Sequence, residues 1–321
     1  MPQISVILPV YNGLNYLKDA ISSLLNQTVS DYEIIVCDDA SIDGSISYLR
    51  ETARQQPNLK ILQNDKNLGL FKTLNKLINA CSSPLIHLWA QDDIMMPDCL
   101  EKCITFHNIH PGITMSYHGV EYLDENGNIK PFEKIDGTPA IIDTLTYASI
   151  SSKWGCIPGN ISNVTINSEY AHTVGLFNEE MVLSADFDLW TKLASKGDIG
   201  RISEKLSFLR LHAGQLSRNY TSIALRIKED IPIQKKITSL LVNNDQGYKI
   251  AKRFWRWKTL PSYFNDLLFL CYVKEYMEAK KLMLLLKDET GILSLFMRWL
   301  MVRSLRALKL DIKFYQKILE K

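Results

Sequence analysis

The sequence lacks an apolar run of the roughly 20 residues that a membrane-spanning helix needs. It also lacks a basic N-terminal segment with a cleavage site, because the chain enters the apolar residues 4–9 almost at once, so we expect no signal peptide. No Gly-x-Gly-x-x-Gly pattern follows a predicted strand, which disfavours a dinucleotide-binding enzyme. Together these absences favour a cytoplasmic protein.

Cysteine is sparse, and the six cysteines are scattered along the chain. Most of them stand in apolar surroundings, which predicts reduced, buried thiols rather than a disulfide framework. Cys99 and Cys103 have the spacing of one helix face, but the sequence shows no second pair of metal ligands beside them. We therefore interpret the cysteines as ordinary core residues.

Neither sign of charge dominates the whole chain, whose net charge is +2, but the two signs are unevenly placed. Residues 222–321 carry 20 Lys and Arg against 10 Asp and Glu, whereas residues 1–221 carry 17 against 25. An acidic body joined to a basic tail indicates two units with different partners. The acidic body also argues against a nucleic-acid ligand, since enzymes of nucleic acids usually present a basic cleft.

Strand-like and helix-like segments alternate over the first 90 residues. Apolar runs at 4–9, 33–37, 59–63 and 84–89 predict strands, and helical spacing marks 14–25, 45–55 and 70–81. This alternation predicts a mainly parallel sheet with crossover helices. A turn-rich stretch at 124–128 predicts a hairpin, and the pattern is almost entirely helical from about residue 222 onward.

Polar residues follow three of the predicted strands. Tyr11 comes after the first strand, Asp38 and Asp39 after the second, and Asp92 and Asp93 after the fourth. Ligands of parallel sheets bind outside the carboxyl ends of the strands, so we expect one shared site. The first acidic pair can accept hydrogen bonds from a base or a ribose, with a helix cap as the alternative. The second pair suits a hard divalent cation held jointly with substrate phosphates.

Several segments together resemble the family 2 glycosyltransferases. They follow the family's order along roughly the first two thirds of the chain, at residues 4–13, 25–28, 32–44, 67–69 with Asn75, and 90–97. The resemblance implies an α/β GT-A fold, with a mixed, mainly parallel sheet flanked by helices, to which this chain adds a C-terminal helical region. It also implies a nucleotide-diphospho-sugar donor and a divalent metal, Mn²⁺ or Mg²⁺.

On the donor side, the resemblance implies roles for residues of the first loops. Tyr11 and Asp39 match positions that hold the base, and Pro9 shapes the strand end before them. Asn67 and Gly69 match further positions of the nucleotide-sugar site.

For the metal, the resemblance implies that Asp93 is a ligand and that Asp92 approaches the ribose. It also implies that His212 reaches the diphosphate or the metal, with a structural hydrogen-bonding role as the alternative. The usual motif has another Asp where Ala90 stands, so water and phosphates would fill the remaining positions.

On the acceptor side, residues 184–190 resemble the motif in which an Asp deprotonates the acceptor hydroxyl. Asp186 matches this general base, although Ala185 replaces the usual Glu before it. The alternative is that Asp186 caps the helix that follows. Asn160 and Trp190 are expected near the acceptor, since amide and aromatic groups suit sugar recognition.

The basic tail contains an amphipathic segment at 292–310. Its polar side carries Arg298, Arg303, Arg306 and Lys309 opposite an apolar side. Such a helix suits a membrane interface with anionic lipids, and packing against the catalytic domain or another subunit is the equal alternative. We predict a catalytic domain at 1–221 and a helical region at 222–321 for membrane contact or oligomerisation, on the inner face of the membrane.

Together these expectations describe a metal-dependent, inverting glycosyltransferase that uses a UDP- or dTDP-sugar. Its acceptor would be a hydroxyl of a glycan or a lipid-linked molecule, and the resemblance implies bacterial surface polysaccharide synthesis. Two alternatives stay open. A nucleotidyltransferase would use a similar sheet and metal, but residues 11–14 are not its Gly-rich phosphate loop. A non-catalytic sugar-nucleotide or glycan binder is kept open by Ala90 and Ala185.

Overall fold

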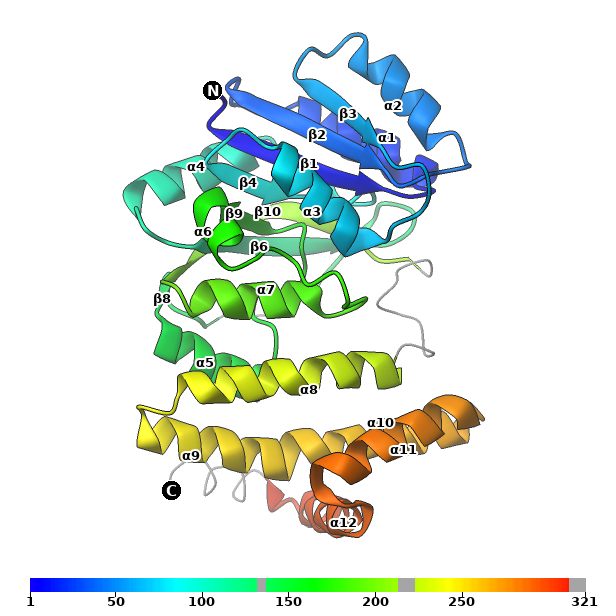
Figure 1. The fold of residues 1–321 in the computed structure, drawn as a ribbon, viewed down its shortest axis with the longest axis vertical. Helices are drawn as coiled ribbons and strands as arrows, with labels where there is room; N and C mark the ends of the chain where they lie inside the picture. The colour runs from blue at the N-terminus through cyan, green and yellow to red at the C-terminus, as the bar shows by residue number, and fades with distance from the viewer. Residues whose placement is uncertain (132–136, 213–222, 312–321) are drawn as a thin grey trace. The chain divides into compact units, whose positions relative to one another are not determined.

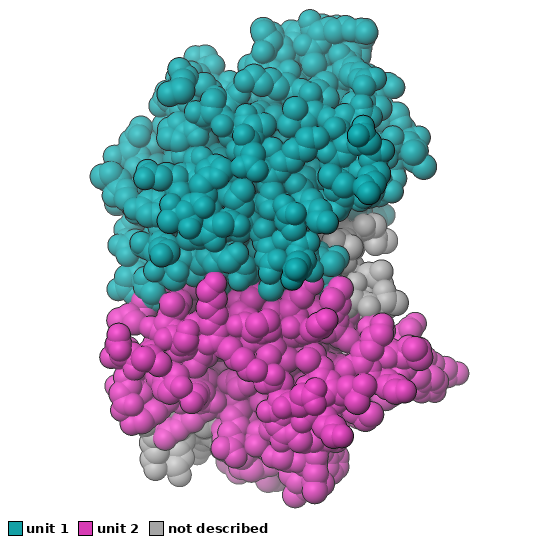
Figure 2. Space-filling view, viewed as in Figure 1, with its two compact units in different colours: residues 1–144, 158–213 teal, residues 145–157, 214–321 magenta. Residues whose placement is uncertain are grey.

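The computed structural model describes residues 1–131, 137–212 and 223–311. Contacts divide the chain into two compact units (Figure 2). Unit 1 comprises residues 1–144 and 158–213, and unit 2 comprises residues 145–157 and 214–321. Whether these units are domains with separate roles, as predicted for 1–221 and 222–321, stays a prediction.

Unit 1 is an α/β unit in which strands and helices alternate from the N-terminus (Figure 1). Its elements in chain order are β1 (Ile4–Val10), α1 (Leu14–Leu25), β2 (Tyr32–Asp38), α2 (Ser45–Ala53), β3 (Leu59–Gln63), α3 (Leu70–Ala80), β4 (Leu85–Leu88), β5 (Ile94–Met95), α4 (Cys99–Ile109), β6 (Met115–Leu123), β7 (Ile129–Lys130), β8 (Ile141–Ile142), β9 (Val164–Asn167), α6 (Ser168–Thr173), α7 (Ala185–Ala194) and β10 (Ile199–Arg210).

The strands form one mixed sheet in the order β3-β2-β1-β4-β9-β6-β10-β5, with β7 paired to β6 and β8 to β10. The neighbours β1, β2, β3 and β4 pair in parallel, as do β6 and β10, whereas β9 is antiparallel to both β4 and β6. The predicted fold class is therefore confirmed. The hairpin is confirmed as well, because the Asp124 amide donates to the Asn128 carbonyl at 2.9 Å between β6 and β7.

The core of unit 1 explains why the strands read as apolar runs. Alternate β1 residues such as Val6 and Leu8 are fully buried against Leu17 and Ile21 of α1. Helices α2 and α4 share this cluster, so the three helices cover one face of the sheet. Burial of each such side chain contributes about 1.5–3 kcal/mol. The packing fixes the parallel strands in register and so gathers the loops that follow them at one edge.

All the secondary-structure elements among the described residues of unit 2 are helices. It contains α5 (Thr144–Trp154), α8 (Ile223–Leu240), α9 (Asp245–Phe254), a π-helical stretch (Trp255–Thr259), α10 (Leu260–Tyr272), α11 (Tyr276–Thr290) and α12 (Ile292–Ala307). The sequence pattern did not indicate that α5 would join the C-terminal helices. Within the unit, Gln234 Nε2 donates to the Ser151 carbonyl at 3.4 Å, and the rings of Trp154 and Phe254 meet edge-on. Among the described helices, none has the length and hydropathy needed to cross a bilayer.

Candidate active site

The loops after β1 and β4 are tied together by Gln91. The Tyr11 amide donates to Gln91 Oε1 at 2.9 Å, and Gln91 Nε2 donates back to the Tyr11 carbonyl at 3.1 Å. Gly13 makes this approach feasible, since a Cβ there would lie 2.2 Å from Gln91 Oε1. The Tyr11 side chain stays 46% exposed, as a platform for a planar ligand requires. Pro9 lies two residues earlier inside β1, at the strand end for which it was predicted.

The loop after β2 is joined to the loop before α3 by Asp39. Its carboxylate accepts hydrogen bonds from the amides of Leu68 at 2.8 Å and Gly69 at 2.9 Å. Asn67 Oδ1 accepts from the same Gly69 amide, and Gly69 has φ +89°, a conformation that favours glycine. The structure thus brings together three of the residues predicted for the donor, Asp39, Asn67 and Gly69. Asp39 is itself buried, so it also fixes the shape of this loop.

Asp92 and His212 form a partly exposed carboxylate–imidazole pair at the site. Asp92 follows β4 and His212 follows β10, and Asp92 Oδ2 lies 2.8 Å from His212 Nε2. Their side chains are 18% and 16% exposed, so both can contact a ligand. The His212 ring also packs on Tyr16, with centroids 4.9 Å apart. Residues 213–222, which follow His212 in the chain, lie outside the described residues.

Asp93 has a different environment from its neighbour. It is only 3% exposed, and its two oxygens accept hydrogen bonds from Ser162 Oγ at 2.6 Å and the Arg210 amide at 2.9 Å. Burial and then the charge of Asp92 raise the pKa of Asp93 to about 7. The structure therefore disfavours the assignment of the metal to Asp93. It places Asp92, rather than Asp93, beside His212.

Arg210 stabilises the loop that carries Asp92, and the sequence did not indicate it as a site residue. It is buried, and its Nε donates to the Asp92 carbonyl at 3.1 Å. Its Nη2 pairs with Asp19 at 3.1 Å, and its guanidinium lies over the Tyr16 ring at 4.8 Å. The sequence offered only its position two residues before His212 as a signal. Arg210 holds the backbone that presents Asp92.

The predicted base Asp186 lies in the first turn of α7 and is half-buried. The N-cap position belongs to Ser184, but Asp186 Oδ1 accepts the Phe187 amide at 2.8 Å, so the capping alternative stays open beside the predicted base. Four residues join helix α7 to β10. Strand β10 is parallel to β6, and β9 is antiparallel to both β6 and β4, so β10 runs in the same direction as β4. The helix must therefore run from the carboxyl edge of the sheet toward the amino edge, over roughly 15 Å. Asp186 consequently belongs to the same edge as Asp92.

The two residues predicted to contact the acceptor, Asn160 and Trp190, have different environments. Asn160 Oδ1 accepts the Ser162 amide at 2.9 Å, and Ser162 in turn contacts Asp93, so Asn160 adjoins the site. Trp190 is fully buried in α7 and packs edge-on against Phe177. This burial gives no support to a contact of Trp190 with the acceptor, which stays a prediction. It lies on the apolar face of the helix, where a large aromatic residue fills the core.

The donor atoms at the carboxyl edge suit a divalent metal. A carboxylate and an imidazole are ligands of first-row divalent ions such as Mn²⁺, and water and phosphates complete the set. Asp92 and His212 supply these two groups at hydrogen-bond distance and with partial exposure. The chemistry of the residues present therefore fits the metal, with Asp92 in the place predicted for Asp93.

A mixed sheet with an acidic carboxyl edge and tyrosine and aspartate loops defines the GT-A class of nucleotide-sugar transferases. Residues 5–157 match the family model of glycosyl transferase family 2. An uncharacterized glycosyltransferase of Haemophilus influenzae is 29% identical over 68% of this chain and 68% of its own length. Another, from Rickettsia conorii, is 32% identical over 68% of this chain and 36% of its own, and chondroitin synthase of Escherichia coli is 26% identical over 67% and 30%. Residues 5–157 therefore belong to glycosyl transferase family 2.

Solved structures show the same fold at low sequence identity. S. aureus TarS 1–349 in complex with UDP-GlcNAc has a TM-score of 0.64 and 18% identity over 100% of this chain and 91% of that one. Mannosyltransferase PcManGT from Pyrobaculum calidifontis, in complex with GDP-Man and Mn²⁺, has a TM-score of 0.55 and 14% identity over 93% and 87%. The chain spans about a third of the Rickettsia conorii and Escherichia coli relatives and about two thirds of the Haemophilus protein.

Proposed function

We propose that this protein is a metal-dependent, inverting glycosyltransferase that moves a sugar from a nucleotide-diphospho-sugar to an acceptor hydroxyl. The observation that carries the proposal is the partly exposed pair of Asp92 and His212 at the carboxyl edge of the sheet. The Tyr11 and Asp39 loops lie at the same edge, because β1, β2 and β4 are parallel neighbours. A nucleotide on those loops extends its diphosphate along this edge, in keeping with ligand binding at strand ends.

Asp92 and His212 would hold the metal in this proposal. When bound, a divalent metal neutralises the charge that develops on the departing nucleoside diphosphate. Arg210 fixes the backbone of Asp92, and the hydrogen bonds of Asp93 hold the ends of β4 and β10 together. These hydrogen bonds thus fix the backbone near Asp92 and His212, as a precise metal site requires.

Asp186 would act as the general base for the acceptor. A carboxylate at hydrogen-bond distance removes the proton as the acceptor oxygen attacks the anomeric carbon, and the sugar–phosphate bond breaks in the same displacement. Attack from the face opposite the diphosphate inverts the configuration. Asp186 lies in the first turn of α7, where negatively charged side chains are favourably placed relative to the helix dipole.

A UDP-sugar, with a dTDP-sugar as second choice, is the donor that we propose. TarS has been crystallised with UDP and with UDP-GlcNAc, which supports this choice through the shared fold. The relatives named chondroitin synthase and hyaluronan synthase support a glycan hydroxyl as acceptor and a role in polysaccharide synthesis. A lipid-linked glycan is the second acceptor class.

The test is release of nucleoside diphosphate by the purified chain. UDP-GlcNAc, UDP-glucose, a dTDP-sugar and GDP-mannose would each be offered with Mn²⁺ or EDTA and a mixture of glycan acceptors. We expect Mn²⁺-dependent release with one donor, and a product whose anomeric configuration is inverted by NMR. Release of pyrophosphate would identify a nucleotidyltransferase instead. Tight donor binding without any turnover would favour the non-catalytic binder.

We also propose that unit 2 makes a peripheral contact with an anionic membrane. Its helices α10–α12 leave many large apolar side chains exposed: Leu268, Phe269, Tyr272, Tyr276, Met277, Leu293, Phe296, Met297, Leu300 and Met301. Residues 222–321 carry a net charge of +10, which favours an anionic lipid surface over a neutral partner. A second copy of the chain is the alternative occupant.

Vesicle flotation tests this contact. Leu293 and Met297 share one face of α12 and are 75% and 56% exposed, so Leu293→Glu with Met297→Glu adds charge without disturbing the core. We expect the double variant to float far less with anionic vesicles than the parent chain. Ile109→Glu, an exposed change in unit 1, is the matched control and should float normally. Equal flotation of all three, with a concentration-dependent dimer lost in the double variant, would point to a second copy.

A further inference from the structure

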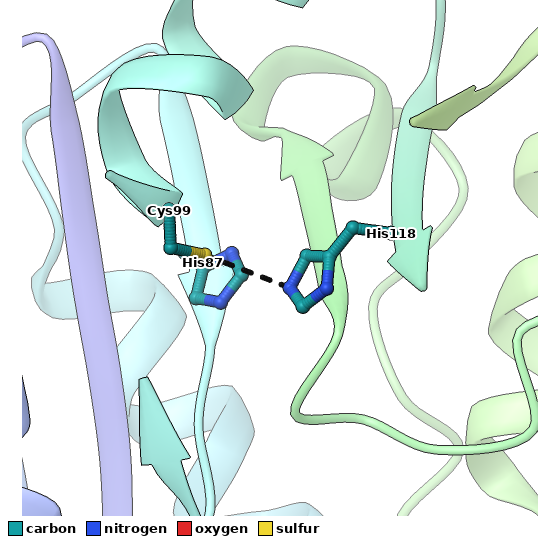
Figure 3. Close-up of side chains that lie close together, drawn as sticks. All are labelled: His87, Cys99 and His118. Atoms are coloured by element: carbon teal, nitrogen blue, oxygen red, sulfur yellow. Dashed lines mark hydrogen bonds between the residues drawn. The ribbon is translucent and has the colours of Figure 1, made fainter. Parts of the chain in front are cut away.

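A cluster of histidine and cysteine lies inside unit 1, apart from the acidic edge. His87 of β4, His118 of β6 and Cys99 of α4 are all fully buried (Figure 3). One potential ligand atom from each lies within 4.8 Å of the other two. The three side chains come from three different elements and point toward one another. Neither the donor site nor the acceptor side of the proposed reaction uses them.

The local register of the sheet brings these residues together. His87 lies opposite Thr165 of β9, and its Nδ1 shares a hydrogen bond with Thr165 Oγ1 at 2.8 Å. Its other nitrogen, Nε2, is buried and makes no hydrogen bond within the described part of the chain. A buried polar atom without a partner destabilises a fold by about 1–3 kcal/mol, so this atom calls for a partner.

His118 is held in the tautomer that a metal ligand needs. Its Nδ1 donates to the Gly119 carbonyl at 2.9 Å, since a carbonyl oxygen can only accept. With the proton on Nδ1, Nε2 is the nitrogen that carries the lone pair of the neutral ring. That Nε2 lies 3.6 Å from Cys99 Sγ. Two ligands of a tetrahedral zinc ion, one sulfur and one nitrogen, are also about 3.6 Å apart, and metal-binding histidines typically donate their other N–H in this way.

A second thiol adjoins the cluster one helical turn further along α4. Cys103 is fully buried there and lies close enough to Cys99 and His87 to interact with both side chains. Two thiolates and two neutral imidazoles around a divalent ion leave no net charge, which a buried position requires. The sequence spacing alone could not indicate this set, because the histidines come from strands on either side of α4 in the chain.

We propose that His87, Cys99, Cys103 and His118 form a buried structural site for a soft divalent transition metal, with zinc as the expected ion. The ion would bind the two sulfurs and one nitrogen of each imidazole, and each thiol would release its proton to solvent on binding. The site would join β4, β6 and α4 and so brace the strand that leads into Asp92. This inference does not depend on the proposed glycosyltransferase activity.

The test begins with the full chain purified by desalting into metal-free buffer. We expect about one zinc per chain by elemental analysis, as for a closed structural site. Chain produced in cobalt-containing medium should show a thiolate-to-cobalt charge-transfer band in the near ultraviolet. The oxygen and imidazole ligands at Asp92 and His212 cannot produce this band. Parent protein without retained metal and without the band would overturn the proposal and leave a metal-free hydrogen-bonded cluster.

Substitutions locate the ion. Cys99→Ala should reduce the retained metal roughly tenfold or more and abolish the band, because it removes a ligand. Cys37→Ala is the matched control, since Cys37 is equally buried in β2 but lies outside the cluster. Asp92→Asn separates the two metal sites and should keep the band. A band that persists in Cys99→Ala, or that is lost equally in Cys37→Ala, would contradict the assignment.

Discussion

The two units of the chain differ in the side chains that they bury and expose. Unit 1 buries charged and polar side chains such as Asp39, Asp93 and Arg210, and each of these makes specific hydrogen bonds at the carboxyl edge of the sheet. Unit 2 leaves large apolar side chains such as Leu293 and Met277 exposed on its helices. Buried polar networks fix geometry, whereas exposed apolar patches mark contact surfaces. This difference underlies the proposal that unit 1 carries the chemistry and unit 2 the attachment.

The largest expected effect is the loss of sugar transfer when one of two carboxylates in α7 is replaced. Asp186→Asn should lower transfer by about 10²–10⁴-fold while donor affinity stays unchanged, because only proton removal is lost. Asp188→Asn is the matched control, since Asp188 is ion-paired with Lys192 at 2.6 Å and does not need to face the acceptor. Initial rates and donor titrations measure both. Similar rates for the two variants would remove Asp186 from the mechanism.

The packing of unit 2 is tested by two leucines of α11. Leu282 is fully buried in the helical core, so Leu282→Ala should reduce the free energy of unfolding by about 2–5 kcal/mol. Leu284 is 50% exposed, and Leu284→Ala should change stability by less than about 0.5 kcal/mol. Urea unfolding of the full chain provides the comparison. Equal losses would mean that the exposed face of α11 is not a free surface.

A buried carboxylate of unit 1 should make stability depend on acid pH. Burial alone would raise the pKa of Glu33, but hydrogen bonds from Lys60, Ser5 and Ser82 outweigh it and lower the pKa to about 2. A lowered pKa stabilises the fold above the unfolded value near 4.5, and this contribution is lost as pH falls toward 2. The loss is about 3 kcal/mol. Glu33→Gln should flatten this part of the pH–stability curve, and an unchanged curve would contradict the assignment.

The smallest effect concerns the tie between the first and fourth loops. Gly13→Ala places a Cβ against Gln91, so it should displace that side chain and weaken nucleotide binding several-fold with little loss of stability. In a Gln91→Ala background the same substitution should have almost no further effect, because the clash is gone. Nucleotide titrations of the four proteins form a double-mutant cycle. Additive effects would show that Gly13 acts independently of Gln91.

Much of the fold was accessible from the sequence, because apolar runs and helical spacing marked β1–β4 and α1–α3. The resemblance to the family also grouped Asp39 with Gly69, which the structure joins by a hydrogen bond. The roles of Asp92 and Asp93 were not accessible. Adjacent residues after a strand point in different directions, and only the position of His212 decides which one faces a ligand.

Other features depended on long-range packing. The aromatic ring of Trp190 suits sugar binding, but helix α7 places this side chain in the core. The pairing of Cys99 with His118 joins a helix to a strand, which no spacing rule indicates. The grouping of α5 with the C-terminal helices likewise appears only in the contacts.

The most direct test of the account is titration of UDP into the chain by calorimetry, with Mn²⁺ or with EDTA. The parent protein should bind UDP in a Mn²⁺-dependent manner, and Asp92→Asn should weaken that binding by roughly 100-fold or more, as expected for loss of a ligand. Asp93→Asn should stay within several-fold of the parent, because an amide can still accept from the Arg210 amide and donate to Ser162. Loss of binding in Asp93→Asn alone, with Asp92→Asn unaffected, would contradict the assignment of the metal to Asp92 and His212.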